Sequence, residues 1–425
     1  MYALQLLWGT PKSSFNLLPV YCHNLKLANP ETVTEITLDG LGRFDMLFVA
    51  LGCSIRLFLG HMRPFLIMDG AHLKGPYVGT MFLVVGMVGN NGIVPIAMGV
   101  GKTKSSLSWT WFLCKLWQCI CDVPNLTFVT DRAASIDLAI RIVFPNVHHI
   151  LCFRHLSQNL RLNSTNEKSK RWMLWEACKA YRLSDFEGTM DLMWYSLPRA
   201  AHYLEKFGYA RWARSHFPGL RYSAMTSNSA ESVNSVTRFA RCVPITMLIE
   251  FFRATLQQWY FIHRHNEAQM MNAVTPWGEA KLEKRIHRST NWKVYPISDL
   301  LFEVDDNYKK GTCDLHAKTY IQYCCQLCSV WFNSDFYRAT YEEEVIPLPP
   351  EAEYVFPNER LTVLPPPLDI QNSGRPRNRD RIPSRDEEPI VKTCSRCGQS
   401  GHFRYNCTSP MPAPRPTHGS SSSRR

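Results

Sequence analysis

The chain has 425 residues, 45% of them hydrophobic and twelve of them tryptophan, which excludes a largely disordered protein. Its net charge of +12 at pH 7 favours a polyanionic partner, and nucleic acid is the first choice. No apolar run reaches the roughly 20 residues that span a membrane, so no membrane partner is expected.

Residues 1–62 are expected to lead into a core that begins at residue 63. Between residues 63 and 156 buried strands alternate with amphipathic helices, and Gly89-Asn-Asn-Gly92 is a hairpin signal. The predicted strands cover 64–68, 77–88, 93–100, 126–130 and 147–151, and the helices cover 108–117 and 133–143. This order, three strands, helix, strand, helix, strand, predicts an α/β domain with the ribonuclease-H-like fold.

The rest of the chain divides by composition. Residues 157–218 are amphipathic and helical, which predicts an all-helical insertion, and 219–284 complete the core with a long helix over 245–271. Residues 285–345 are weakly patterned, and the prolines and arginines of 346–390 indicate an extended linker. A compact cysteine motif occupies 391–410, and 411–425 form a tail expected to be disordered.

Three acidic residues are spaced along the core like a nuclease active site. Asp69 and Asp131 each follow an apolar run predicted to be a strand, and Glu231 lies in Thr226-Ser-Asn-Ser-Ala-Glu-Ser-Val-Asn234. Carboxylates suit Mg²⁺ or Mn²⁺ because these cations prefer oxygen ligands. Two such ions roughly 3.5–4 Å apart can activate a nucleophile and stabilise the leaving oxygen. The alternative is local, with Asp69 starting a turn and Asp131 capping the next helix.

Cys152 and His155 directly follow the strand predicted over 147–151. A Cys-x-x-His pair could supply half of a metal site, or His155 could contact the substrate phosphate near the scissile bond. A buried structural pair is the alternative.

Several of these motifs closely resemble those of plant Mutator-like element (MULE) transposases. The resemblance rests on Pro64-Phe-Leu-Ile-Met-Asp-Gly-Ala-His-Leu-Lys-Gly75, Ser108-Trp-Thr-Trp-Phe-Leu113, Thr130-Asp-Arg132, Phe144-Pro-Asn-Val-His-His-Ile-Leu-Cys-Phe-Arg-His155 and the segment around Glu231. It implies that Asp69, Asp131 and Glu231 are a catalytic DDE-type triad, and that Cys152 and His155 are the family's Cys-x-x-His signature. The implied activity is metal-dependent DNA cleavage and strand transfer at element ends.

The chain also departs from that family pattern. Such transposases usually carry a DNA-binding region upstream of the core, which is expected to be missing here. They also carry a SWIM-type zinc finger after the core, but its Cys-x-Cys and Cys-x-His pairs are absent, as if excised. A residual group remains, made of Cys313, His316, Cys324 and Cys328. Lys102 and Lys104 stand where these proteins often carry an acid.

The cysteine motif near the C-terminus has the spacing of a retroviral-type CCHC zinc knuckle. Its three thiolates and one imidazole predict closed tetrahedral coordination of Zn²⁺, with the metal supplying the folding energy of so short a loop. The predicted ligands are Cys394, Cys397, His402 and Cys407.

Aromatic and basic side chains accompany these ligands and predict contacts to single-stranded nucleic acid. They are Arg396, Phe403, Arg404 and Tyr405. A zinc site used for protein contacts is the alternative.

Upstream of the knuckle, Gly374-Arg-Pro-Arg377 resembles the core of an AT-hook, in which Arg375 and Arg377 would enter a narrow minor groove. A charged linker or an import signal is the alternative for this segment.

The sequence therefore predicts a MULE-type transposase or a transposase-derived protein, located in the nucleus. Its expected partners are DNA (element ends and target), single-stranded nucleic acid and further copies of the chain. One alternative is a catalytically silent, domesticated DNA-binding or transcription-related protein, and another is a decayed element copy. The presence of all three acids favours enzymatic ancestry, because a purely regulatory descendant has no chemical need to keep them.

Overall fold

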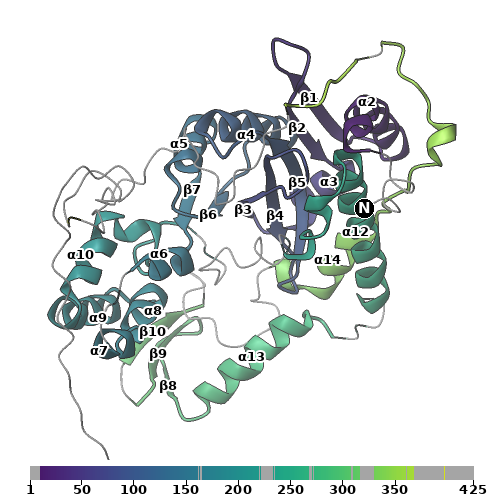
Figure 1. The fold of residues 1–425 in the computed structure, drawn as a ribbon. Coiled ribbons are helices and arrows are strands. Elements are labelled where there is room, and N and C mark those ends of the chain that lie inside the picture. The colour runs from purple at the N-terminus through teal and green to yellow at the C-terminus, as the bar shows by residue number, and fades with distance from the viewer. Residues whose placement is uncertain are drawn as a thin grey trace, which may run out of the picture. The chain divides into compact units, whose positions relative to one another are not determined.

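The computed structural model describes residues 10–160, 162, 165–219, 221, 233, 235–267, 270, 272–307, 310–315, 330–359, 361–367 and 397. The chain forms two compact units, Met1–Ile382 and Pro383–Arg425. Cys397 alone is described in the second unit, so the helices and strands below all belong to the first (Figure 1). Within the described ranges, no helix has the length and apolar character needed to cross a membrane.

A seven-stranded mixed sheet forms the centre of the first unit, with strand order β1-β2-β5-β4-β3-β6-β7. Strands β3, β4 and β5 pair antiparallel as a meander, whereas β6 and β7 run parallel to β3. The two remaining strands extend the sheet antiparallel beyond β5. The strands are β1 (Val33–Leu38), β2 (Phe44–Ala50), β3 (Phe65–His72), β4 (Thr80–Met87), β5 (Ile93–Gly101), β6 (Thr127–Thr130) and β7 (His148–Leu151).

Helices cover this sheet, and its inner strands are largely buried. Every residue of β4 is buried, as expected for a strand that is covered on both faces. Near the sheet, α4 packs against α5, and α2 packs against α12 (Figure 1). The helices of this part are α2 (Pro11–Ala28), α3 (Gly52–His61), α4 (Ser106–Ile120), α5 (Ala134–Val143) and α12 (Ile245–Glu267).

The elements predicted between residues 63 and 156 are all present, and the α/β class is confirmed. The predicted hairpin joins β4 to β5, with Asn91 in the left-handed region (φ 59°) that asparagine tolerates well. Residues 1–62, expected only to lead into the core, contribute α2, β1, β2 and α3 to it. The seven residues of β2 include five consecutive buried ones, so this segment is as central as the predicted strands.

A helical lobe follows β7 and has a core of its own. The lobe centres on Trp212, which is fully buried, stacks on Phe153 and donates a hydrogen bond from its indole N–H to the carbonyl of Leu204. The described residues of 157–218 contain helices and no strand, as predicted. The helical elements are α6 (Phe153–Asn159), α7 (Thr165–Ser169), α8 (Trp172–Lys179), α9 (Leu183–Ser196), α10 (Pro198–Lys206) and η1 (Tyr209–Arg211).

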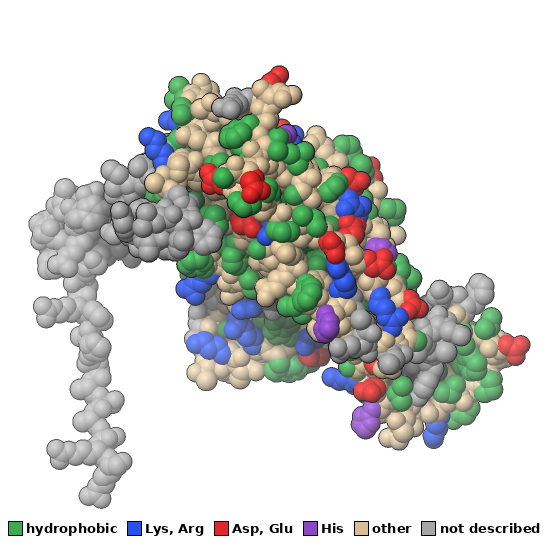
Figure 2. Space-filling view, turned by 90° about the vertical axis from the view of Figure 1, so that its right-hand side faces the viewer, with side chains coloured by type: hydrophobic (Ala, Val, Ile, Leu, Met, Phe, Trp, Pro, Cys, Tyr) green, Lys and Arg blue, Asp and Glu red, His purple; other side chains and the backbone are tan. Residues whose placement is uncertain are grey.

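The weakly patterned part after α12 contains a second, smaller sheet. Its three antiparallel strands have the order β10-β9-β8. The elements of this part are α13 (Pro276–Ser289), β8 (Lys293–Pro296), β9 (Leu301–Asp305), β10 (Lys310–Asp314), η4 (Val330–Phe332), α14 (Ser334–Arg338) and η5 (Ala339–Tyr341). On the face of the molecule shown in Figure 2, basic and acidic side chains are interspersed, so no single-sign surface dominates it.

The described start of the predicted linker, up to residue 367, packs against the N-terminal part of the core. Asn29 bonds the backbone of Ile346 in both directions, at 2.9 and 3.0 Å, and Asn24 bonds Val355 in the same way at 2.9 Å. Further along, Val363 is fully buried, and Leu364 accepts a backbone hydrogen bond from Phe44 at the start of β2. Apart from the 3-10 helix η6 (Glu351–Glu353), the described part of this stretch contains no helix, and it is part of the folded unit and not a free linker.

We predict that Asn29→Ala lowers the free energy of unfolding by about 1–3 kcal/mol, because it removes the two hydrogen bonds that the buried side chain of Asn29 makes with the backbone of Ile346. Urea unfolding followed by tryptophan fluorescence measures the change. Asn166→Ala, on the exposed surface of α7, is the matched control and should stay within about 0.5 kcal/mol of the parent. Equal stability of the two variants would contradict the packing role of this segment.

Candidate active site

The structure brings Asp69 and Asp131 to the same edge of the sheet. Strands β3 and β6 are parallel, with Phe65 opposite Thr127 and Ile67 opposite Val129. Continuing this register by two residues puts Asp69 directly opposite Asp131. Their backbones are then about 5 Å apart, which is the spacing of neighbouring strands. Asp69 directly follows four buried residues of β3, and Asp131 follows the last residue of the fully buried β6. Both carboxylates therefore emerge from the core at adjacent points.

Each carboxylate is also held by the local backbone. One oxygen of Asp69 accepts a hydrogen bond from the N–H of Gly70 at 2.8 Å, and Oδ1 of Asp131 accepts from the N–H of Ala133 at 3.0 Å. The sequence left open that Asp131 only caps the next helix. The second bond agrees with that role only in part, because the N-cap of α5 is Ala133 and no side chain caps this helix. A capping role does not account for the pairing with Asp69.

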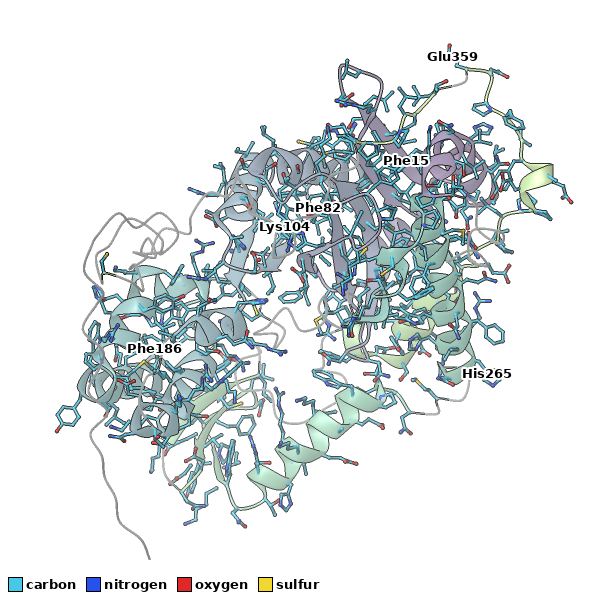
Figure 3. All side chains as sticks on the ribbon, in the orientation of Figure 1. Phe15, Phe82, Lys104, Phe186, His265 and Glu359 are labelled. Atoms are coloured by element: carbon cyan, nitrogen blue, oxygen red, sulfur yellow. The ribbon has the colours of Figure 1, made fainter. Side chains whose placement is uncertain are left out.

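The two carboxylates interact electrostatically. Burial raises the pKa of Asp69, and the negative charge of Asp131 raises it further. Lys104, the N–H of Gly70 and His155 act in the opposite direction, and Lys104 is the strongest of these three. Lys104 lies between β5 and α4, close to Phe82 of β4 (Figure 3). The carboxylates thus share a space that favours positive charge.

Cys152 and His155 lie at the same edge but have different environments. Cys152 directly follows β7, its N–H donates to the carbonyl of Thr130 at 2.7 Å, and its side chain is fully buried in the core. His155, in the first turn of α6, is partly exposed and interacts electrostatically with Asp69. Within the described ranges no three His, Cys, Asp or Glu side chains cluster as a metal site. Cys152 is thus part of the apolar core, whereas His155 acts electrostatically on Asp69.

The donor chemistry of Asp69 and Asp131 fits a hard divalent cation. Burial is the main cause of the raised pKa of Asp69, and the negative charge of Asp131 adds to it. A cation between the two carboxylates relieves their repulsion. The expected third ligand, Glu231, lies outside the described residues. Several other predicted site residues also lie outside them: Arg375, Arg377, Cys394, Arg396, His402, Phe403, Arg404, Tyr405 and Cys407, and with them His316, Cys324 and Cys328 of the residual group.

A partly buried polar cluster that the sequence did not predict supports Asp131. Thr130 donates its hydroxyl to the carbonyl of Asp131 at 2.6 Å and lies 2.8 Å from Nε2 of His149. The other ring nitrogen of His149 lies 3.1 Å from Oδ1 of Asp137 and 3.0 Å from the guanidinium of Arg211. Arg211 also pairs with Asp137. This cluster ties the helical lobe, through Arg211, to the backbone that carries Asp131.

Charge is distributed unevenly in this cluster. Burial lowers the pKa of His149, which keeps the ring neutral at pH 7. Burial alone would raise the pKa of Asp137, but His149, Arg211 and Arg141 outweigh it and hold that pKa well below its ordinary value. A second link to the lobe lies next to Asp131, where Arg132 donates to the hydroxyl of Tyr203 at 3.1 Å. In the sequence, the adjacent histidines His148 and His149 were the signal that could have pointed to this cluster.

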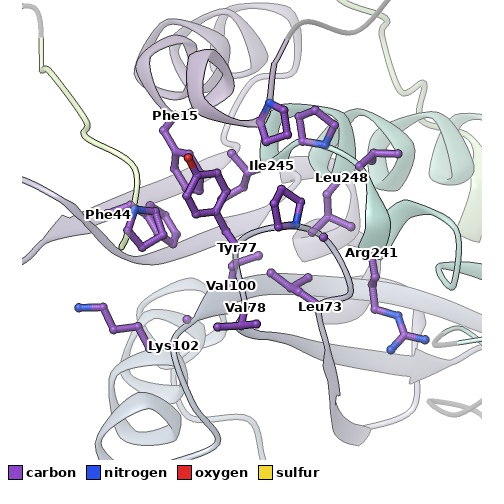
Figure 4. A pocket seen from close by; sticks show the side chains of 17 residues that line it. Phe15, Phe44, Leu73, Tyr77, Val78, Val100, Lys102, Arg241, Ile245 and Leu248 are labelled. Carbon is purple, nitrogen blue, oxygen red and sulfur yellow. The ribbon is translucent and has the colours of Figure 1, made fainter. Parts of the chain in front are cut away.

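An apolar cavity lies next to the candidate site, and Arg241 is one of the residues that line it. The guanidinium of Arg241 donates to the carbonyl of His72 at 3.1 Å and interacts electrostatically with Asp69. Aromatic rings line the cavity beside it, including Phe15 and Tyr77, which meet edge to face (Figure 4). The cavity is thus a neighbour of the carboxylate pair, beyond the end of β3.

Part of the chain matches the model of a known protein family. Residues 65–159 match the family model described as the MULE transposase domain. This stretch runs from the start of β3 to the end of α6, so it contains Asp69, Asp131, Cys152 and His155. No curated protein matches the chain. The match supports a transposase-type function, and a transposase domain implies DNA binding in general.

We predict that Asp137→Asn destabilises the protein at pH 7 by about 1–3 kcal/mol, because the lowered pKa of Asp137 means that its charged form stabilises the fold. This contribution is complete above the ordinary pKa of about 4 and is lost as the pH falls below it toward the folded-state pKa. The gap between parent and variant should therefore narrow between about pH 4 and pH 2.

Urea unfolding at a series of pH values measures that gap. Asp191→Asn, at an exposed position of α9, serves as the control and should show no pH-dependent gap. A gap for Asp137→Asn that persists unchanged at low pH would refute the electrostatic role.

Proposed function

We propose that the chain is a Mutator-like transposase, or a protein derived from one, whose active site performs metal-dependent DNA cleavage and strand transfer. One observation carries this proposal: Asp69 and Asp131 lie side by side on parallel strands within the stretch that matches a MULE transposase domain. A purely structural pair of buried like charges would be unfavourable without a cation to share. The pairing therefore supports a site that binds a cation.

The strand order supports the ribonuclease-H-like part of this proposal. Within the sheet, β5-β4-β3-β6-β7 form a five-strand set in which an antiparallel meander is followed by two parallel strands reached through helices. The two acids occupy the adjacent central strands, β3 and β6, of this set. That is the position expected for the metal-binding acids of the fold.

In the proposed mechanism, Asp69, Asp131 and Glu231 would hold Mg²⁺ or Mn²⁺ through carboxylate oxygens. When bound, the metal activates the attacking water or 3′-hydroxyl and stabilises the leaving oxygen. The chain's own residues orient these ligands: β3 and β6 fix the spacing, and the Thr130 hydroxyl holds the carbonyl of Asp131. His155 would contact a phosphate oxygen of DNA beside Asp69, and its electrostatic interaction with Asp69 supports this role.

The alternative is a catalytically silent DNA-binding protein, or a decayed copy, that retains the fold. The positive charges of Lys104 and Arg241 near Asp69 are the observation that favours it, because they supply part of the neutralisation that a metal provides. The retained pairing of Asp69 with Asp131 favours the enzyme.

For the C-terminal unit we propose a CCHC zinc knuckle that binds nucleic acid, with Cys394, Cys397, His402 and Cys407 as ligands. The charge of this region supports it: residues 370–425 hold eleven Lys and Arg against four Asp and Glu, which is +7 of the net +12. We further propose that Arg375 and Arg377 contact DNA and that the protein acts in the nucleus.

We predict that Asp131→Asn reduces cleavage of DNA bearing the element ends by at least about a hundredfold, since an amide is a weaker cation ligand than a carboxylate. Purified full-length protein, duplex oligonucleotides and Mn²⁺ form the assay, and denaturing gels measure the nicked product. Asp122→Asn, an exposed acid bonded to Trp117 at the end of α4, is the control and should cleave normally. Undiminished cleavage by Asp131→Asn would end the proposal.

We predict one zinc per full-length chain, lost on substitution of a knuckle ligand because four ligands close the coordination shell. Elemental analysis of the purified protein should find about one equivalent in the parent and almost none in Cys397→Ser. Cys114→Ser alters an exposed thiol of α4 and should keep its zinc. Equal zinc in both variants would rule out the knuckle.

A further inference from the structure

Helix α13, which precedes the small sheet (Figure 1), is anchored to the core at its first turn. Thr275 caps the helix by accepting a hydrogen bond from the N–H of Gly278 at 3.3 Å. The backbone N–H of Trp277 donates to Asn90 of the β4–β5 hairpin at 2.9 Å, and its ring stacks on Phe332 with 5.4 Å between centroids. Of the fourteen residues of α13, all of them described, Gly278 alone is buried. The later turns of α13 are therefore accessible to a partner.

The lysines and arginines of α13 form a row along one face of the helix, here called the basic row. They follow the spacing i, i+3, i+4, i+7, which places side chains on the same side. The two acids of the helix, Glu279 and Glu283, are four residues apart and lie on the opposite side. The members of the basic row are all exposed, and they are Lys281, Lys284, Arg285 and Arg288.

This arrangement brings like charges together on α13. Lys281 is four residues from Arg285, and Lys284 is four residues from Arg288. Pairs of like charge at this spacing destabilise a helix, whereas pairs of opposite charge stabilise it. In the described part of the chain, Lys284, Arg285 and Arg288 make no ion pair that would offset the repulsion. The basic row is thus unfavourable for α13 by itself and suits an external anion.

The helical lobe brings a further cation to the basic row. Arg214 is partly buried, and its guanidinium lies 4.9 Å from the centre of the Tyr181 ring. Burial lowers the pKa of Arg214 and the positive charge of Arg285 lowers it further, whereas Tyr181 acts in the opposite direction. Arg214 and Arg285 are therefore close enough to repel each other. An anion held between them would relieve that repulsion.

We propose that the basic row of α13, together with Arg214, binds the phosphate backbone of duplex DNA. From Lys281 to Arg288 the row extends about 10 Å along the helix axis, at 1.5 Å per residue. That length corresponds to about three phosphates of one DNA strand, which follow one another at about 3.4 Å along the duplex. Arginine suits such a partner because its guanidinium can donate two parallel hydrogen bonds to one phosphate.

The match to a transposase domain in the same chain favours DNA as this polyanion over an acidic protein, because that match implies DNA binding. This inference rests on the proposed function for the identity of the partner, and it names a surface that holds that partner. Since phosphate contacts position a duplex without reading its sequence, the basic row would bind any duplex.

The experiment measures binding of the full-length protein to labelled duplex oligonucleotides by fluorescence anisotropy over a series of salt concentrations. Mg²⁺ and Mn²⁺ are left out so that no cleavage takes place. Lys284→Gln/Arg285→Gln/Arg288→Gln should bind at least about tenfold more weakly at about 0.1 M salt. The slope of log K against log salt should become shallower by about 2 to 3, because each lost phosphate contact removes about 0.9. The loss should be equal for an element-end duplex and an unrelated one.

Two control variants separate this role from net charge and from folding. Lys12→Gln/Lys26→Gln/Arg199→Gln removes three exposed positive charges from α2 and α10 and should keep the parent slope. Arg285→Lys/Arg288→Lys retains the charges of the basic row and should also keep that slope. Glutamine and lysine are good helix formers, so all variants should have the urea midpoint of the parent.

Equal shallowing in the α13 variant and the α2/α10 variant, or none in either, would overturn this inference. The proposed function would then stand if cleavage still depends on Asp131. Weakened binding of an acidic peptide by the α13 variant, with duplex DNA bound as by the parent, would also overturn it and indicate a protein partner. Cleavage unaffected by Asp131→Asn would remove the proposed activity but leave the basic row as a DNA-binding surface. A parent that binds neither duplex would overturn both.

Discussion

The parallel pairing of β3 with β6 is the contact on which the candidate site depends. These strands are separated in the chain by residues 73–126, which form a hairpin and a helix, yet their register sets two acidic side chains next to each other. The period of a strand is two residues, so a slip of one residue would turn Asp69 into the core and away from Asp131. The continuous burial of Phe65–Met68 opposes such a slip, because it would bring the carboxylate into apolar surroundings.

Support for this pair comes from parts of the chain far from it in sequence. The lobe inserted after β7 reaches back through Tyr203, which bonds Arg132, and through Arg211, which pairs with Asp137 of α5. Since the lobe has its own apolar core around Trp212, it can hold these contacts rigidly. An insertion between the second acid and Glu231 is therefore also a structural support for the second acid.

Local patterns in the sequence predicted the elements near the site well. The apolar runs ending in Asp69 and Asp131 predicted strands with an acid at each end, and the Asn-Gly step predicted the hairpin. The Asp137–His149–Arg211 cluster could not be predicted, because its members lie up to 74 residues apart and each alone resembles an ordinary surface residue. The sequence did not predict β1 and β2. Residues 33–50 precede the run of predicted strands, which begins at residue 64, although β2 is strongly apolar.

Asn24 and Asn29, at the end of α2, have a further consequence for the way this unit is assembled. They fasten residues 346–355 to the beginning of the chain, while β2 completes the sheet beside β5. The stretch 65–159 that matches the family model is therefore only part of a larger core and cannot fold as an independent unit. Expressed alone, it would present the bare edge of β5 and the apolar surfaces normally covered by α2 and α12, and a fragment of that kind aggregates.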